Sequence, residues 1–196
     1  MPATLRTFIA IELDEALKDN LTRLQDRMRQ QLSPHAVRWV RSEGVHLTLK
    51  FLGDTTPPQV EQVKKALAQA AAAVHPFRFT VGGVGCFPNT RQPRVVWVGI
   101  HEPTGALARL RDAIEAQVVP LGFPTEKRAF HPHLTLGRVG RRASKSEVRE
   151  VGEMVATSAV GNLDEMDVTA VAYIKSDLRP SGAVYTTLYH AGLKAG

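Results

Sequence analysis

The chain has 196 residues, 43% of them hydrophobic, so it can bury a real core in one domain or in two small lobes. Its formal charge of +6 favours anionic partners, nucleic acid above all. Cys86 is the only cysteine, which excludes an internal disulfide and a cysteine zinc cluster and fits the cytoplasm. No apolar run approaches the length of a membrane span and the first residues do not resemble a signal peptide, so we expect no membrane association.

The first half of the chain alternates strand and helix patterns, and two of its helix starts carry cap residues. Asp14 precedes a run of leucines at helical spacing, so it predicts an N-cap. Thr56 is followed by two prolines and then Gln59, which predicts a capping box with proline at the first helical position. We expect strands over residues 7–13, 37–40, 46–53 and 77–81, and helices from 15 to about 33 and from 57 to 75.

The second half repeats this order. A stretch rich in glycine and proline over residues 82–93 connects the halves, and we do not expect it to bind phosphate because no helix starts after its glycines. Ser144 and Glu147 predict another capping box. We expect strands over residues 95–100, 133–139, 168–174 and 183–189, a turn over 179–182, and helices over about 107–118 and 145–155.

One tetrapeptide occurs in both halves. His46-Leu47-Thr48-Leu49 and His133-Leu134-Thr135-Leu136 are identical, and each lies in a predicted strand. Because side chains alternate along a strand, the leucines share one face and enter the core, while histidine and threonine share the other face. If the tetrapeptide occurred only once, its histidine would be an ordinary polar residue on a half-exposed strand. Two identical copies indicate a shared task.

The duplicated pattern predicts an α+β fold. We expect one bilobal domain over residues 1–196, with a first repeat over about 5–90, a second over about 94–193, and terminal strands free to cross between the lobes. Each lobe would contain a mainly antiparallel sheet with helices on its outer face. A pseudo-two-fold axis would then bring the two His-x-Thr strands together across a groove.

Two histidines that face one atom from opposite sides can act as a base and an acid. The unperturbed histidine pKa of about 6.5 allows one ring to be neutral and the other protonated near pH 7. In-line displacement at phosphorus needs this pair, because an incoming oxygen loses a proton on one side while a leaving oxygen gains one on the other.

These residues resemble a known family. The two His-x-Thr motifs, Trp39-Val40, the run from His46 to Asp54, the run from Phe130 to Arg138, and the late Ser176-Asp177-Leu178…Gly182…Tyr185 pattern are similar to the RNA 2′,3′-cyclic phosphodiesterases. This is the 2′-5′ RNA ligase-like (LigT) branch of the two-histidine (2H) phosphoesterases. The resemblance covers nearly the whole chain and implies the LigT-like fold.

The resemblance also implies the chemistry and the site. It implies metal-independent hydrolysis, without a cofactor, of an RNA 2′,3′-cyclic phosphate end to a 2′-phosphomonoester. His46 would be the proton donor and His133 the proton acceptor, while Thr48, Thr135 and Arg138 would bind the phosphate. The partner would be RNA with a 2′,3′-cyclic phosphate end or a small cyclic phosphate nucleotide. We expect a monomer, because nothing in the sequence demands an oligomer.

Arg138 conflicts with strict alternation, which would place it on the leucine face. A bulge at Gly137 would return its side chain to the phosphate. The matching position in the first repeat is Phe51, which the same bend would direct into the groove, where it would stack on a nucleobase; the alternative is a core phenylalanine. Lys50 would share the face of His46 and either add charge to the groove or be an ordinary solvated lysine. Basic residues that would line an RNA path, or be ordinary surface charges, are Arg41, Arg91, Arg94, Arg141 and Arg142.

Two alternatives remain open. His131, His133 and His46 could supply three nitrogen ligands to a metal, but no carboxylate accompanies them, so we expect no metal and a supporting role for His131. The remaining histidines, His35, His75, His101 and His190, receive no role. The second alternative is a protein that binds or joins RNA ends without significant phosphodiesterase turnover. Ligation of 2′-5′ linked ends would reverse the same chemistry.

Overall fold

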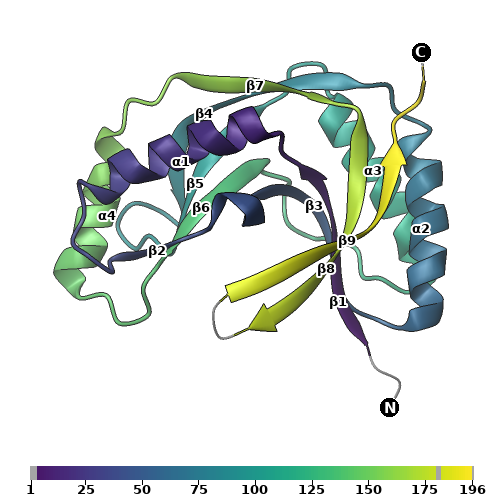
Figure 1. Ribbon diagram of the computed structural model, residues 1–196, viewed down its shortest axis with the longest axis horizontal. Coiled ribbons are helices and arrows are strands. Elements are labelled where there is room, and N and C mark those ends of the chain that lie inside the picture. The colour runs from purple at the N-terminus through teal and green to yellow at the C-terminus, as the bar shows by residue number, and fades with distance from the viewer. Residues whose placement is uncertain (1–3, 180–181, 196) are drawn as a thin grey trace.

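The computed structural model describes residues 4–179 and 182–195. Within them, helices and strands alternate along most of the chain (Figure 1). The strands are β1 (Leu5–Glu12), β2 (Val37–Trp39), β3 (His46–Thr55), β4 (Phe77–Phe87), β5 (Val95–His101), β6 (His133–Val139), β7 (Asn162–Val168), β8 (Ala170–Arg179) and β9 (Gly182–Gly192). The helices are α1 (Glu15–Arg29), α2 (Pro57–Ala71), α3 (Ala106–Val118) and α4 (Lys145–Thr157), with short 3₁₀ turns at Ser42–Gly44 and Val119–Leu121.

The described strands form two antiparallel sheets. One has the order β3-β1-β8-β9 and the other the order β2-β6-β5-β4-β7. Each sheet therefore contains strands from both halves of the sequence. β8 and β9 from the end of the chain complete the sheet begun by β1 and β3, while β2 and β4 from the first half join the second sheet.

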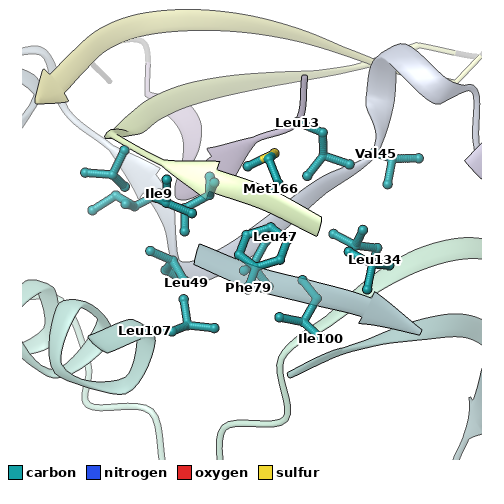
Figure 2. Packing of buried hydrophobic residues seen from close by; sticks show 14 of the residues in the cluster. Ile9, Leu13, Val45, Leu47, Leu49, Phe79, Ile100, Leu107, Leu134 and Met166 are labelled. Carbon is teal, nitrogen blue, oxygen red and sulfur yellow. The ribbon is translucent and has the colours of Figure 1, made fainter. Parts of the chain in front are cut away.

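The helices cover one face of each sheet. α2 and α3 pack on each other and against strands of the four-stranded sheet, while α1 and α4 pack against β7 and β4 of the five-stranded sheet. A continuous apolar core includes residues of all four described helices. Leu47 and Leu134 of the two repeated tetrapeptides lie in this same cluster (Figure 2). The α+β class with two antiparallel sheets and outer helices is confirmed.

The predicted helix starts are also confirmed. The Asp14 carboxylate accepts a hydrogen bond of 2.8 Å from the Leu17 amide. Thr56 and Gln59 form the predicted capping box, and Ser144 forms the other one with Glu147. These caps satisfy amides that have no partner inside the helix, which is why each helix begins where it does.

Two predictions about the strands were wrong. The stretch after residue 81 is not a connection, because β4 continues to Phe87, where its glycines allow close packing: a Cβ atom on Gly85 would lie 2.2 Å from the Trp97 ring. β7 was not predicted, since its sequence NLDEMDV is mostly polar. It pairs only with β4, at the edge of the five-stranded sheet, where exposed polar side chains are tolerated. Part of the turn predicted over 179–182 lies outside the described residues.

Candidate active site

The two His-x-Thr strands come from different sheets and contact each other. β3 is an edge strand of the four-stranded sheet, and β6 lies between β2 and β5 in the other. All four leucines of the repeated tetrapeptides are buried in the core. The histidines and threonines point to the opposite faces and are partly exposed, so the alternation predicted from the sequence is confirmed.

Both strands carry a β-bulge at the same place. The pairing of β6 with β5 passes from Thr135 to Gly137, and the pairing of β3 with β1 passes from Thr48 to Lys50, so each skips the residue three after the histidine. After the bulge the facing of the side chains is reversed. Arg138 is therefore exposed and Phe51 is 64% exposed, on the side of their histidines. The predicted bulge is present, with Leu136 rather than Gly137 as the unpaired residue, and Phe51 is not a core residue.

The bulge also shows that the placement of Lys50 was wrong. Its side chain enters the core, is 5% exposed, and forms an ion pair of 2.7 Å with Glu115 of α3. Its ammonium also donates to the Pro124 carbonyl at 2.6 Å. Lys50 therefore ties β3 to α3 and the following loop, and adds no charge on the side of His46.

The face of the four-stranded sheet that is free of helices is called the site face below. Phe8, Ala10, Ala172 and Ile174 form its buried apolar floor. The His46 ring stacks on Phe8 with 4.6 Å between ring centroids, and the edge of Tyr185 packs against His46 at 5.0 Å.

The surroundings of His46 favour the neutral imidazole. Burial lowers its pKa to about 4, although a hydrogen bond to the Gly44 backbone and the negative charge of Glu12 both oppose this shift. The Glu12 carboxylate is itself held by two donors from β9, Thr187 Oγ1 at 2.7 Å and His190 Nε2 at 2.5 Å. His190, which received no role from the sequence, thus contacts the carboxylate that faces His46 across β1 and β3.

His133 is held by a backbone contact and two aromatic rings. Its Nδ1 lies 2.6 Å from the His131 carbonyl, so Nδ1–H donates and the neutral ring keeps its lone pair on Nε2. Phe87 packs edge-on against the ring at 5.0 Å and Trp97 lies at 6.1 Å. His131 supports the site through this carbonyl, while its own side chain is exposed.

The Tyr185 phenol is influenced by charged residues from both sheets. Burial raises the pKa of its phenol, while the positive charges of Arg138 on β6 and Arg6 on β1 lower it. Arg138 is therefore close enough to act on a ring that packs against His46. His46 of β3 and Arg138 of β6 therefore both lie near Tyr185.

Some functional neighbours could not be identified from the sequence. Phe8, Phe87 and Trp97 pack on the catalytic candidates from strands far away in the chain. Alternation indicates only the facing of Phe8 and Glu12, because residues 8, 10 and 12 alternate with core residues of β1; it does not indicate which ring they contact. Tyr185 belonged to the family pattern but had been given no role.

One cavity in the described part of the structure lies away from the two histidines, and no metal-ligand cluster was found there. In residues 4–179 and 182–195 no three histidine, cysteine or acidic side chains gather so that they could hold a metal ion. A cavity of about 500 Å³ opens between the end of α2, β4 and the start of α3, and neither His46 nor His133 lines it. Within the same residues no helix combines the length and apolarity that a membrane span requires.

Comparisons with known proteins agree with this geometry. The family described as LigT-like phosphoesterase matches residues 11–97 and again residues 98–185. An RNA 2′,3′-cyclic phosphodiesterase of Methanothermobacter thermautotrophicus is 33% identical over 184 residues, which cover 94% of this chain and 96% of that protein. A protein of the same name from Aeropyrum pernix is 35% identical over 170 residues, covering 86% and 92%.

Solved structures share the fold. A crystal structure of a Thermus thermophilus protein superposes with a TM-score of 0.79 at 28% identity, covering 97% of this chain and 98% of that one. E. coli LigT complexed with 3′-AMP superposes with a TM-score of 0.74 at 26% identity, covering 98% and 100%. Fold, paired motifs and matches together define an enzyme that cleaves phosphate esters. The chain belongs to the LigT-like phosphoesterase family.

Proposed function

We propose that this phosphoesterase hydrolyses 2′,3′-cyclic phosphate ends of RNA to 2′-phosphomonoesters, with His46 as proton donor and His133 as proton acceptor. The observation that carries the proposal is the contact between β3 and β6, each of which directs one copy of the same histidine and threonine away from the core. The relatives named RNA 2′,3′-cyclic phosphodiesterase and the 3′-AMP complex of E. coli LigT support this substrate class.

The reaction moves one proton at each histidine. A water oxygen forms a bond to phosphorus as the Nε2 lone pair of His133 takes the water proton. The bond between phosphorus and the 3′ oxygen breaks on the opposite side, and the protonated ring of His46 gives its proton to that oxygen. The product keeps its phosphate on the 2′ oxygen. Each ring must come within about 3 Å of the oxygen it serves.

The negative charge that builds up on the non-bridging oxygens needs donors. The hydroxyls of Thr48 and Thr135 lie on the same faces as their histidines and can donate to these oxygens. The bulge after Thr135 exposes Arg138, whose guanidinium suits a phosphate. No metal or cofactor takes part in the proposed steps, and both histidines belong to one chain, so we propose that a monomer is active.

The burial of His46 adds a requirement. With a pKa of about 4 the ring is neutral near pH 7 when the site face is empty, so it must take up a proton when it binds the substrate. An anionic phosphate beside the ring favours the imidazolium by direct attraction. Glu12 acts in the same direction, since its negative charge opposes the shift caused by burial.

A turnover assay tests the proposal. A 2′,3′-cyclic phosphate oligonucleotide is incubated with the protein in excess EDTA, and the products are separated. We expect a 2′-phosphate product, and a loss of at least about a hundredfold in turnover in His46→Ala and in His133→Ala, because each removes one proton transfer. His75→Ala, at an exposed histidine after α2, is the matched control and should retain wild-type turnover.

Three outcomes would contradict the mechanism: full activity of either histidine variant, loss of activity on chelation, or a 3′-phosphate product. Binding without turnover would favour the alternative of an RNA-end binding protein. If the 5′ hydroxyl of another RNA end takes the place of the attacking water, the same base and acid give a 2′-5′ diester and a free 3′ hydroxyl. Slow joining of ends should therefore disappear in the same two variants.

A further inference from the structure

The site face continues beyond the two histidines along β1. Residues 6, 8, 10 and 12 point to this face, because Ile9 and Ile11 between them are core residues. Glu12 lies at the end near His46, Phe8 lies beneath the His46 ring, and Arg6 lies at the far end, exposed to solvent. The cationic side chain of Arg6 therefore lies on the same face as His46, on the far side of Phe8 along β1.

Arg6 and Arg138 act on the same phenol. Both positive charges lower the pKa of Tyr185, although Arg6 comes from the four-stranded sheet and Arg138 from the five-stranded sheet. Tyr185 thus stands within electrostatic reach of two guanidinium groups. One of them is the proposed ligand of the cyclic phosphate, and the other has no role in opening it.

Exposed aromatic rings lie on the same face, next to Phe8. Phe51 is 64% exposed and lies 6.0 Å from Phe8, and Tyr185 is 36% exposed and packs edge-on against Phe8 at 5.4 Å. Aromatic side chains next to basic ones are the usual platform for single-stranded nucleic acid, because every base can stack on them. Arg6 has Asp54 as its cross-strand neighbour, and among the described residues the two form no ion pair.

A nucleotide at an RNA 3′ end carries two phosphates, the cyclic one on its 2′ and 3′ oxygens and the diester on its 5′ oxygen. They are separated by one sugar, from which the base projects. Two guanidinium groups, with aromatic rings on the same face, match a substrate that has two phosphates with a nucleoside between them. A cyclic mononucleoside phosphate lacks the 5′ diester and would leave one of the cations without a partner.

We propose that Arg6 binds the phosphodiester on the 5′ side of the terminal nucleotide, so that the preferred substrate is a single-stranded RNA end rather than a free cyclic nucleotide. This inference rests on the proposed function and names its substrate class. Phe51 and Tyr185 would flank the terminal nucleoside between the two phosphates.

The test compares two substrates that differ by that diester and by the nucleoside that it attaches. kcat/KM is measured for a nucleoside 2′,3′-cyclic phosphate and for the dinucleotide that carries the same nucleoside at its 3′ end, with wild type, Arg6→Ala and Arg6→Gln. The ratio of dinucleotide to mononucleotide kcat/KM should fall by about tenfold in both variants, because each loses a hydrogen bond to a charged group. With longer oligonucleotides the salt slope of log kcat/KM should become shallower by about 0.7, as expected for one lost phosphate contact on a single strand.

Arg149→Ala is the matched control. It removes one positive charge from α4, where Arg149 is largely exposed and pairs with Glu153, and it should leave the substrate ratio unchanged. An unchanged ratio in both Arg6 variants, or an equal fall in the Arg149 variant, would overturn the inference. Because the wild-type rate on the mononucleotide reports the basic reaction, its absence would count against the proposed function instead. Far-UV circular dichroism of each variant shows whether the fold is retained.

Discussion

At the scale of single residues, the surroundings of His46 govern its protonation. Its ring lies between Phe8 and Tyr185, and this burial brings its pKa to about 4, below the usual 6.5. A histidine that is neutral in the folded state and protonated in the unfolded state links stability to pH. The contribution of neutral His46 to the free energy of unfolding is complete above about pH 6.5. It is lost as the pH falls toward 4.

The corresponding prediction concerns acid stability. Between pH 7 and pH 4.5 the unfolded chain gains the His46 proton and the folded chain largely does not, which costs the wild type about 2 kcal/mol of unfolding free energy. In His46→Gln this loss should be absent, so the variant should be less sensitive to acid than the wild type. Urea unfolding at both pH values measures it. The same pH dependence in both proteins would show that burial does not perturb the ring.

Much of the candidate site followed from local rules. Alternation along a strand correctly placed His46, His133 and the two leucines of each tetrapeptide. Packing partners such as Phe8, Phe87 and Trp97 could not be assigned in this way, because they reach the histidines across strands whose pairing the sequence does not specify. Lys50 was misplaced for a related reason, since one extra residue in β3 reverses the facing of the side chains that directly follow it.

At the scale of elements, the paired bulges in β3 and β6 are the feature that shapes the site. In β6 the bulge is packed tightly against β2. A Cβ atom on Gly137 would lie 2.5 Å from Val37 Cγ1 and 3.3 Å from the Arg38 carbonyl. Glycine is therefore required where the strand bends to turn Arg138 outward.

Replacing Gly137 tests this dependence. Gly137→Ala should displace the bulge or β2, lower stability by about 1–3 kcal/mol as overpacking does, and reduce phosphodiesterase turnover by moving Arg138. Val37→Ala removes the atom that would clash most severely, so the double variant should recover part of both losses. Thermal unfolding and turnover of the single and double variants give the comparison. Wild-type values for Gly137→Ala would show that the bulge tolerates a side chain.

The sequence predicted the helices correctly but misjudged strands β4 and β7 of the five-stranded sheet. Cap residues and apolar periodicity are local signals, and α1, α2 and α4 begin where those signals predicted. β4 and β7 were misjudged because glycines and acidic residues usually indicate loops. In this fold the glycines of β4 make room for Trp97 and for the backbone of the chain before β7, contacts that only the tertiary structure creates.

At the scale of the whole molecule, each sheet contains strands from both sequence repeats. β1 pairs with β8, and β4 pairs with β5 and β7. The LigT-like family matches the chain twice, so the repeats are related in sequence, yet neither contains a complete sheet. We propose that residues 1–196 form one duplicated domain rather than two independent ones.

Separating the repeats tests this proposal. Fragments 4–93 and 94–195, expressed alone, should lack a cooperative thermal transition, because each would expose sheet edges and apolar surface that the other repeat covers. Mixing them should restore β-sheet circular dichroism and phosphodiesterase turnover. A sharp melting transition in either isolated fragment would show that the repeats are separate domains.

The exchange of strands between the sheets has a mechanical consequence. Enzymes made of two bodies joined by one linker open and shut around their ligand by a hinge. Here several backbone crossings and one continuous apolar core join the sheet that carries His46 to the sheet that carries His133, so moving the two imidazoles apart would break packed core contacts. An RNA terminus would therefore enter a reaction centre that is already assembled, and the speed of its capture would depend on diffusion and charge rather than on a closing motion.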